Sequence, residues 1–227
     1  MSTLPLVGMI TATDGSFSIK VNRYLPYCCT AIHDGSNLRK SLSGKINLDE
    51  YNRWFEEDPF TGDFIASMPI TLIGNDSRYE YDLNRDTEGC VLEEAWGKQV
   101  WKTKLSPKEK QISKQKHTNY YKVTFALIKK LEELFDGCVV YDIHAYNQER
   151  WDRKVPLFNI GTERVDTKKF GKVIGHWEKE LSEISLPDIE NTTGINDVFK
   201  GRGYNLDFIT SNFNKTLVLA TEVKKVY

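Results

Sequence analysis

The chain has 227 residues, of which 40% are hydrophobic and 28% are charged, as in ordinary globular proteins. Its 31 basic and 32 acidic side chains nearly cancel, so the charge does not point to nucleic acid or an anionic membrane as a partner. No apolar run is long enough to cross a bilayer, and residues 1–5 lack the features of a signal peptide. We therefore expect a cytoplasmic protein with no nucleic-acid or membrane partner.

The composition along the chain is even, with no internal repeats and no linker-like stretch. We therefore predict a single domain over residues 1–227. The cysteines at 28, 29, 90 and 138 show none of the paired spacing of a structural zinc site, and we expect them to be reduced and structural.

The first half of the chain is predicted to contain most of the short strands, because apolar segments alternate there with turn signals. Residues 6–32 are predicted to form strands that lead to His33, after which a polar loop runs to residue 45. Further strands are predicted at 68–73 and 79–83.

Between these strands, residues 48–68 are predicted to be helical or mixed. Asp58 followed by Pro59 is typical of a helix start, with the aspartate as the cap and the proline at the first helical position. Residues 88–116 are charged and are predicted to form a surface excursion.

The clearest helix covers residues 119–135, because its apolar positions keep helical spacing. Gly137 ends it and a strand at 138–143 follows at once, which is half of a βαβ unit and indicates an α/β fold. The remaining predicted elements are a helix at 166–184, a loop at 187–203 and a last strand at 216–223.

Two histidines follow apolar runs that are typical of buried strands, His33 after the run ending at Ile32 and His144 after residues 139–143. Ligands collect at the carboxyl ends of such strands, and two imidazoles with an acid commonly build a catalytic zinc site. Asp142 would share a strand face with His144 and could orient its imidazole. A partly buried structural histidine is the alternative at both positions.

The acidic cluster Glu56-Glu57-Asp58 could supply the third metal ligand, from either Glu57 or Asp58. The alternative for this cluster is a helix start where acidic residues favour the helix dipole.

Glu222 ends an apolar run, where a carboxylate is costly unless it has a partner or a task. Beside a metal it could take a proton from water and pass it to a leaving amine. An ion pair with Lys224 or Lys225 is the alternative.

Two arginines, Arg78 and Arg85, lie close together in sequence with Asn84 between them. Arginine grips a carboxylate with two parallel hydrogen bonds, and an asparagine amide can donate another. This group suits a substrate with a free carboxylate. A structural ion pair with Asp82 or Asp86 is the alternative.

Several short motifs keep an order along the chain, from about residue 30 to the end. They are His33-Asp34-Gly35, Glu57-Asp58-Pro59, Ser77-Arg78-Tyr79 through Asp82-Leu83-Asn84-Arg85, Tyr141-Asp142-Ile143-His144-Ala145, Phe199-Lys200-Gly201 with Phe208-Ile209-Thr210, and Thr221-Glu222-Val223. Their types and order resemble the N-formylglutamate amidohydrolase family. The segment from Ser77-Arg78-Tyr79 to Asn84-Arg85 and the Asp-x-His strand are the specific parts of this resemblance.

The resemblance implies an α/β, single-domain, three-layer sandwich with a mostly parallel mixed central sheet, of the zinc-exopeptidase-like (phosphorylase/hydrolase-like) type. It implies one zinc per chain and the following roles: His33, Asp58 and His144 as metal ligands, Glu222 as the general base, and Arg78, Asn84 and Arg85 as the receptor of a substrate carboxylate.

The departures from the family pattern lie mostly at substrate-contact positions. Ser211 stands where family members carry arginine, Ala145 replaces a serine, Lys224 replaces an arginine, Asp34 neighbours the first ligand, and residues 204–206 stretch the preceding loop. The expected metal ligands are intact.

We predict a zinc-dependent amidohydrolase that cleaves a small N-acyl (N-formyl-like) amino acid or a peptide end with a free carboxylate. The alternatives are a metallocarboxypeptidase-like hydrolase of a larger peptide or cell-wall fragment, which the stretched loop would admit, and a non-catalytic binding module of the same fold.

Overall fold

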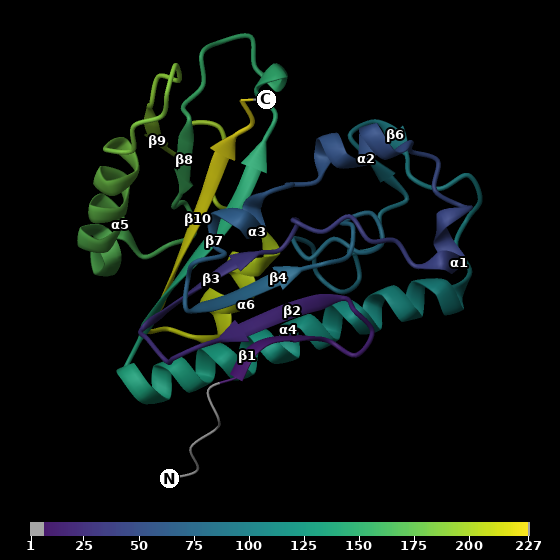
Figure 1. The fold of residues 1–227 in the computed structure, drawn as a ribbon, viewed down its shortest axis with the longest axis horizontal. Helices are drawn as coiled ribbons and strands as arrows, with labels where there is room; N and C mark the ends of the chain where they lie inside the picture. The colour runs from purple at the N-terminus through teal and green to yellow at the C-terminus, as the bar shows by residue number, and fades with distance from the viewer. Residues whose placement is uncertain (1–6, 227) are drawn as a thin grey trace.

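The computed structural model describes residues 7–226, and a mixed β-sheet lies at its centre (Figure 1). The eight strands lie in the order β1 (Val7–Thr11), β2 (Phe17–Val21), β4 (Ile70–Gly74), β3 (Tyr27–Ala31), β7 (Cys138–Tyr146), β10 (Thr216–Lys224), β8 (Phe158–Gly161) and β9 (Thr193–Ile195). The four central strands, from β4 to β10, are parallel, whereas antiparallel pairs occur on both sides of them.

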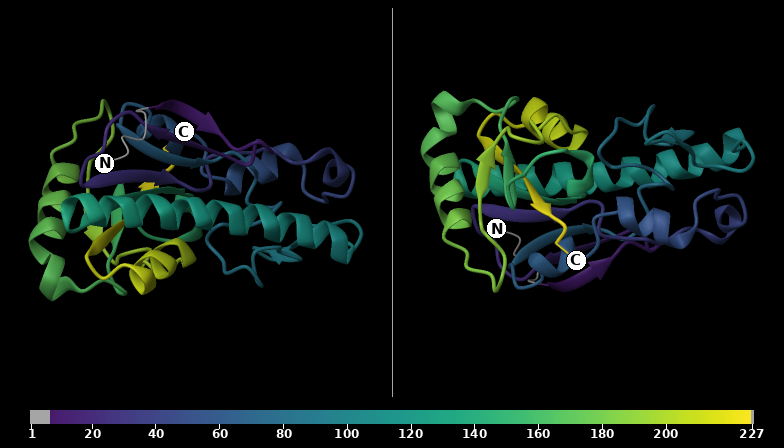
Figure 2. Two further views of the ribbon diagram at one scale, coloured as in Figure 1. Left: turned by 90° about the horizontal axis from the view of Figure 1, so that it is seen from below. Right: turned by 90° about the horizontal axis from the view of Figure 1, so that it is seen from above.

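Helices lie on both faces of this sheet, which confirms the predicted α/β sandwich. Figure 2, seen from below, shows α4 (Pro107–Phe135) in front of the sheet. The apolar core on that face joins α4 and α6 (Tyr204–Asn212) to the central strands. On the opposite face, α5 (Thr167–Ser182) packs against β8 and β10, and α3 (Thr61–Phe64) lies near β3 and β7. None of the helices in residues 7–226 is long and apolar enough to cross a membrane.

The long helix α4 begins earlier than its apolar spacing predicts. Ser106 and Glu109 form a capping box, in which each side chain accepts a hydrogen bond from the other residue's backbone N–H, and Pro107 occupies the first turn. Residues 107–116, predicted as part of a surface excursion, are therefore helical. Their many charged side chains conceal the helical period.

The predicted strand at 79–83 is wrong, because this segment consists of turns and irregular backbone. Its alternating residues Tyr79 and Tyr81 are buried in two separate core clusters rather than on one face of a sheet. The backbone N–H of Asp82 donates to the carbonyl of Cys90 at 2.7 Å, outside any sheet. The alternating pattern therefore predicts correctly that these tyrosines are buried, but it predicts the wrong backbone conformation for the segment.

The predicted helix start at Asp58-Pro59 is also wrong. The helix α2 (Glu50–Glu56) ends just before these residues, and α3 begins only after Phe60. Phe60 has a left-handed backbone conformation, with a φ of 71°, so the chain is not helical between the two helices. The carboxylate of Asp58 caps no helix and instead lies beside two imidazoles.

The structure also contains elements that the sequence pattern does not reveal. The predicted loop at 187–203 contains β9, and β8 has no strong alternation. Residues 204–206 form the first turn of α6. The four cysteines are buried and form no disulfide, and burial raises the pKa of Cys29 to about 12.

A buried charge network attaches α4 to the segment that carries Arg78. The Lys116 ammonium lies 2.8 Å from Asp76 and 2.9 Å from Glu80, and Glu80 also pairs with Arg39 at 2.6 Å. Removing one member of such a network leaves buried charge without compensation.

We expect Lys116→Met to lower the free energy of unfolding by about 3 kcal/mol, measured by urea denaturation. Lys114→Met is the matched control on the same helix, because Lys114 pairs with the exposed Glu88 and its loss is expected to cost under about 1 kcal/mol. Equal losses in the two variants would contradict this role of the network.

Candidate active site

The carboxyl ends of neighbouring parallel strands bring the predicted site residues together. His33 follows β3, His144 lies near the end of β7, and Glu222 is directly opposite His144 in the register of β10. Side chains at paired positions share one face of a sheet, so His144 and Glu222 face the same space. Asp58 reaches it from the loop after α2, where its backbone N–H donates to the His33 carbonyl at 3.0 Å.

His33, Asp58 and His144 form a compact, buried triad. The Nδ1 atoms of His33 and His144 lie 3.3 and 3.2 Å from the same Asp58 oxygen, Oδ2. One potential ligand atom from each residue lies within 4.8 Å of the others. Two imidazole nitrogens and a carboxylate oxygen form a donor set that suits zinc, which leaves a fourth position for water or substrate.

Glu57, the alternative third ligand, lies elsewhere. Its carboxylate accepts a hydrogen bond from the buried hydroxyl of Ser77. Of the two acids that the sequence left open, the structure therefore places Asp58 beside both histidines.

Each imidazole of the triad is oriented by a second carboxylate. Nε2 of His33 lies 2.7 Å from Asp82, and Nε2 of His144 lies 3.2 Å from Asp142, whose other oxygen accepts a 2.6 Å hydrogen bond from Thr30. A carboxylate on one ring nitrogen fixes the tautomer and directs the other nitrogen's lone pair toward a metal. The sequence suggests this arrangement for Asp142 but not for Asp82, whose partner is 49 residues away.

The electrostatics of the cluster favour a positive charge at its centre. Burial alone would raise the pKa of Asp58, but hydrogen bonds with His144 and His33 hold it well below its usual range. Burial likewise opposes protonation of His144, yet the neighbouring Asp142 raises the pKa of that imidazole well above its usual value. A bound divalent cation would supply this positive charge and displace the protons.

Glu222 is the acidic residue that pairs with His144 of the triad across β7 and β10. Burial raises its pKa to about 7, an effect that the nearby His144 partly opposes. Among the described residues it makes no ion pair with Lys224 or Lys225, and the Lys225 ammonium instead donates to the carbonyls of Phe55 and Glu57, both at 2.6 Å. Glu222 therefore has the pKa expected of a group that exchanges protons near neutral pH.

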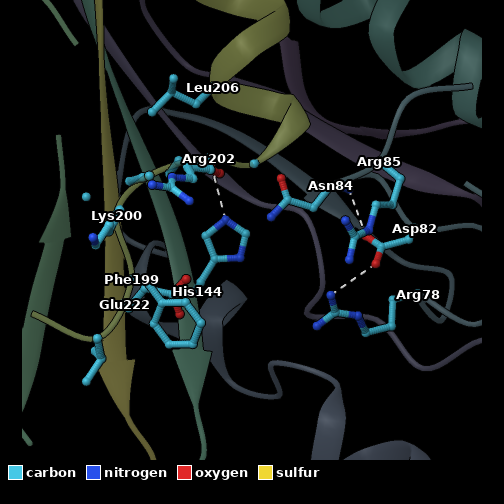
Figure 3. A pocket seen from close by; sticks show the side chains of 16 residues that line it. Arg78, Asp82, Asn84, Arg85, His144, Phe199, Lys200, Arg202, Leu206 and Glu222 are labelled. Atoms are coloured by element: carbon cyan, nitrogen blue, oxygen red, sulfur yellow. Dashed lines mark hydrogen bonds and ion pairs between the residues drawn. The ribbon is translucent and has the colours of Figure 1, made fainter. Parts of the chain in front are cut away.

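Two adjoining cavities meet at these residues. The loop lobe, of about 410 Å³, is bounded by residues 198–203. The hairpin lobe, of about 200 Å³, reaches Arg150 and Trp96. Trp96 lies in the hairpin turn between the short antiparallel strands β5 (Glu94–Ala95) and β6 (Lys98–Gln99). Only the hairpin lobe is lined by His33 and Asp58. The residues that line both lobes are Arg78, Asn84, Arg85, His144, Phe199 and Glu222. Figure 3 shows Arg78, Asn84 and Arg85 across the cavity from His144 and Glu222.

The two arginines that were predicted to bind a carboxylate differ in their partners. Arg78 pairs with Asp82 at 3.1 Å and donates to the carbonyl of Glu56, so the structural ion pair, the alternative for this residue, is present. The exposed Arg85 guanidinium makes no hydrogen bond or ion pair with the described residues. Asn84 lies beside it. Of these two arginines, Arg85 is therefore the one whose guanidinium is free to bind an anion.

Comparisons with known proteins identify the family of the chain and its fold. The sequence model of the N-formylglutamate amidohydrolase family matches residues 25–223. An N-formylglutamate amidohydrolase from Ralstonia eutropha JMP134 has a similar fold, with a TM-score of 0.71, 16% identity, and coverage of 92% of this chain and 85% of that one. A gene product from Agrobacterium tumefaciens is also similar, with a TM-score of 0.69, 13% identity, and coverage of 92% and 84%. No curated protein matches the chain in sequence. The chain therefore belongs to the N-formylglutamate amidohydrolase family, a family of hydrolases that act on the carbon–nitrogen bonds of amides.

Proposed function

We propose that this chain is a zinc-dependent amidohydrolase that cleaves a small N-acyl amino acid, or a peptide end, with a free carboxylate. The observation that carries the proposal is the convergence of two imidazole Nδ1 atoms on Asp58, with Glu222 in register beside His144. The family supports amide hydrolysis, and this donor set supports zinc.

We assign the metal to His33, Asp58 and His144, with one zinc per chain. When bound to these residues, zinc would supply the Lewis acid needed to polarise the carbonyl of the scissile amide. Asp82 and Asp142 hold the two imidazoles in the orientation that this binding requires.

Glu222 acts as the general base of the reaction and then as its general acid. As a carboxylate, it takes a proton from the water that attacks the amide carbonyl. It then gives this proton to the nitrogen as the carbon–nitrogen bond breaks, so that an acid and an amine leave. Its pKa of about 7 suits both steps, because neither protonation state is strongly disfavoured near neutral pH.

Arg85 and Asn84 position the substrate by its free carboxylate. Arg85 has no competing side-chain partner among residues 7–226, whereas Arg78 is held by Asp82. Arg78 therefore balances the charge of the buried acids, and Arg85 receives the substrate.

We expect Arg85→Gln to raise KM by about ten- to hundredfold with a smaller change in kcat, because a lost charge-assisted hydrogen bond costs about 1.5–3 kcal/mol. Steady-state kinetics on an N-acyl amino acid measure both constants. Arg202→Gln is the matched control, since Arg202 lines the same cavity but is already held by Glu163 at 2.8 and 2.9 Å. A KM that rises as much in the control would contradict the assignment.

The proposed function is tested by a hydrolysis screen of N-acyl amino acids, each offered with a free and with an esterified carboxylate. Release of the free amine only from the carboxylate forms is the expected result. Binding without release of amine from any compound would indicate a non-catalytic module, and cleavage of the esterified forms at equal rates would contradict carboxylate recognition.

A further inference from the structure

The loop that carries Asp58 is attached to the sheet mainly by polar contacts. Asp58 comes shortly after α2, and none of the side chains of that helix is fully buried. The backbone N–H of Asp58 donates to the His33 carbonyl at 3.0 Å, and its own carbonyl accepts a 2.7 Å hydrogen bond from the Thr61 hydroxyl. The position of Asp58 therefore depends on the groups that fix the end of α2.

Three consecutive carbonyls at the end of α2 accept hydrogen bonds from side chains of distant segments. The Lys225 ammonium donates to the carbonyls of Phe55 and Glu57, both at 2.6 Å. The Asn147 amide also donates to the Phe55 carbonyl, at 2.9 Å, and Arg78 donates to the carbonyl of the residue between them at 3.1 Å. The last carbonyls of a helix have no partner within the helix, so these side chains complete its C-terminus.

Two of these side chains come from the strands that supply the site. Asn147 is the residue after β7 and Lys225 is the residue after β10, so each lies shortly beyond a site residue, His144 or Glu222. The backbone N–H of Lys225 donates to the Tyr146 carbonyl at 2.9 Å, which joins the two strand ends. The ends of β7 and β10 therefore fix both their own site residues and the loop after α2.

Both donors are almost completely removed from solvent. Lys225 is 9% exposed and Asn147 is 4% exposed. Burying an ammonium is costly unless acceptors surround it, and within residues 7–226 the hydrogen bonds of this ammonium all go to the end of α2. The ammonium also lies 5.8 Å from the centroid of the Phe55 ring. Lys225 is therefore dedicated to the segment that leads to Asp58.

We propose that Lys225, assisted by Asn147, is a positioning residue that holds Asp58 between the imidazoles of His33 and His144. The ammonium fixes the carbonyls on both sides of residue 56 and thereby the peptide that leads to Asp58, whose N–H is directed at His33. This inference rests on the proposed function, because it concerns the metal ligand that is assigned there.

The sign of the effect on zinc affinity separates positioning from simple charge. An ammonium near a cation site repels the cation, so removal of a Lys225 that acted only by its charge would strengthen zinc binding. Removal of a residue that holds a metal ligand in place has the opposite effect, and the loss of such a partner costs about 10- to 100-fold in metal affinity.

The test measures zinc affinity, by competition with a chromophoric chelator, in the parent and in variants of two lysines. Lys225→Met is expected to raise the Kd for zinc about 10- to 100-fold. Lys225→Arg keeps a cation with several N–H donors and is expected to keep most of the affinity. Lys215→Met is the matched control, because Lys215 precedes the other end of β10 and pairs with the exposed Asp136. It is expected to leave the Kd unchanged.

Hydrogen exchange of the metal-free proteins gives a second measurement that does not depend on zinc. The Asp58 N–H is expected to exchange about tenfold or more faster in Lys225→Met than in the parent, because hydrogen bonds to a charged donor are lost. Lys215→Met is expected to leave this exchange unchanged. Asn147→Ala removes one of two donors to the Phe55 carbonyl, so it is expected to raise the exchange rate and the zinc Kd by about two- to tenfold. It decides the question if Lys225→Met shows no cooperative thermal melt.

Unchanged or tighter zinc binding in Lys225→Met, or an equal loss in Lys215→Met, would overturn the positioning role and leave the metal site and the proposed hydrolysis in place. If the parent binds no zinc, the zinc site of the proposed function fails, and the exchange of the Asp58 N–H decides the inference. Faster exchange in Lys225→Met alone would then support it, and equal exchange in the parent and this variant would reject it.

Discussion

Glu222→Gln is expected to lower kcat by about 10²- to 10⁴-fold while leaving zinc bound, because the amide cannot accept the proton from the attacking water. The substitution keeps the size of the side chain and removes a charge that burial disfavours, so thermal stability is expected to stay the same or rise. Steady-state kinetics, metal analysis and a thermal melt measure the three quantities.

Glu163→Gln is the control for this experiment, since Glu163 is exposed and pairs with Arg202 outside the triad. A Glu222→Gln protein that turns over as fast as this control would show that Glu222 is not the base. A variant that loses zinc as well as turnover would indicate that Glu222 acts on the metal site rather than on the proton.

His144→Ala is expected to abolish both zinc binding and turnover. It removes one of the two imidazoles that meet at Asp58, and it leaves Asp142 without the partner that lies 3.2 Å away. Two remaining protein ligands hold zinc far less tightly than three. Metal analysis after dialysis and an activity assay measure the loss.

His176→Ala is the matched control, because His176 lies exposed on α5 and, within residues 7–226, pairs only with Glu180. It is expected to keep zinc and activity. Asp58→Asn and Glu57→Gln separate the two acids that the sequence left open. Zinc is expected to be lost in the first and kept in the second, where Ser77 remains the neighbour of the altered side chain. The reverse result would assign the third ligand to Glu57.

The parts of the site that the sequence predicts are those whose signal is local. His33, His144 and Glu222 each follow an apolar run, and each run forms most of a central strand. His33 lies just after β3, whereas His144 and Glu222 lie within β7 and β10. Parallel strands then bring their carboxyl ends to one edge, as expected for an α/β fold. The central strands and the helices at 119–135 and 166–184 are predicted for the same reason.

The parts that the sequence does not predict depend on contacts between distant segments. Asp82 meets His33 across 49 residues, and Trp96 reaches the cleft only because its hairpin folds over Arg78. Asp58-Pro59 reads as a helix start because a cap and a metal ligand can be the same residue type. Local sequence patterns contain no information that separates these two roles.

Zinc titration of the metal-depleted protein decides whether hydrolysis depends on a metal at His33, Asp58 and His144. The chain is stripped with a chelator, dialysed, and assayed on an N-acyl amino acid as zinc is added back. We expect no activity in the stripped protein, and a linear rise in activity that ends at one zinc per chain. Full activity in the stripped protein, or no response to zinc from a folded protein, would contradict a zinc-dependent site at His33, Asp58 and His144.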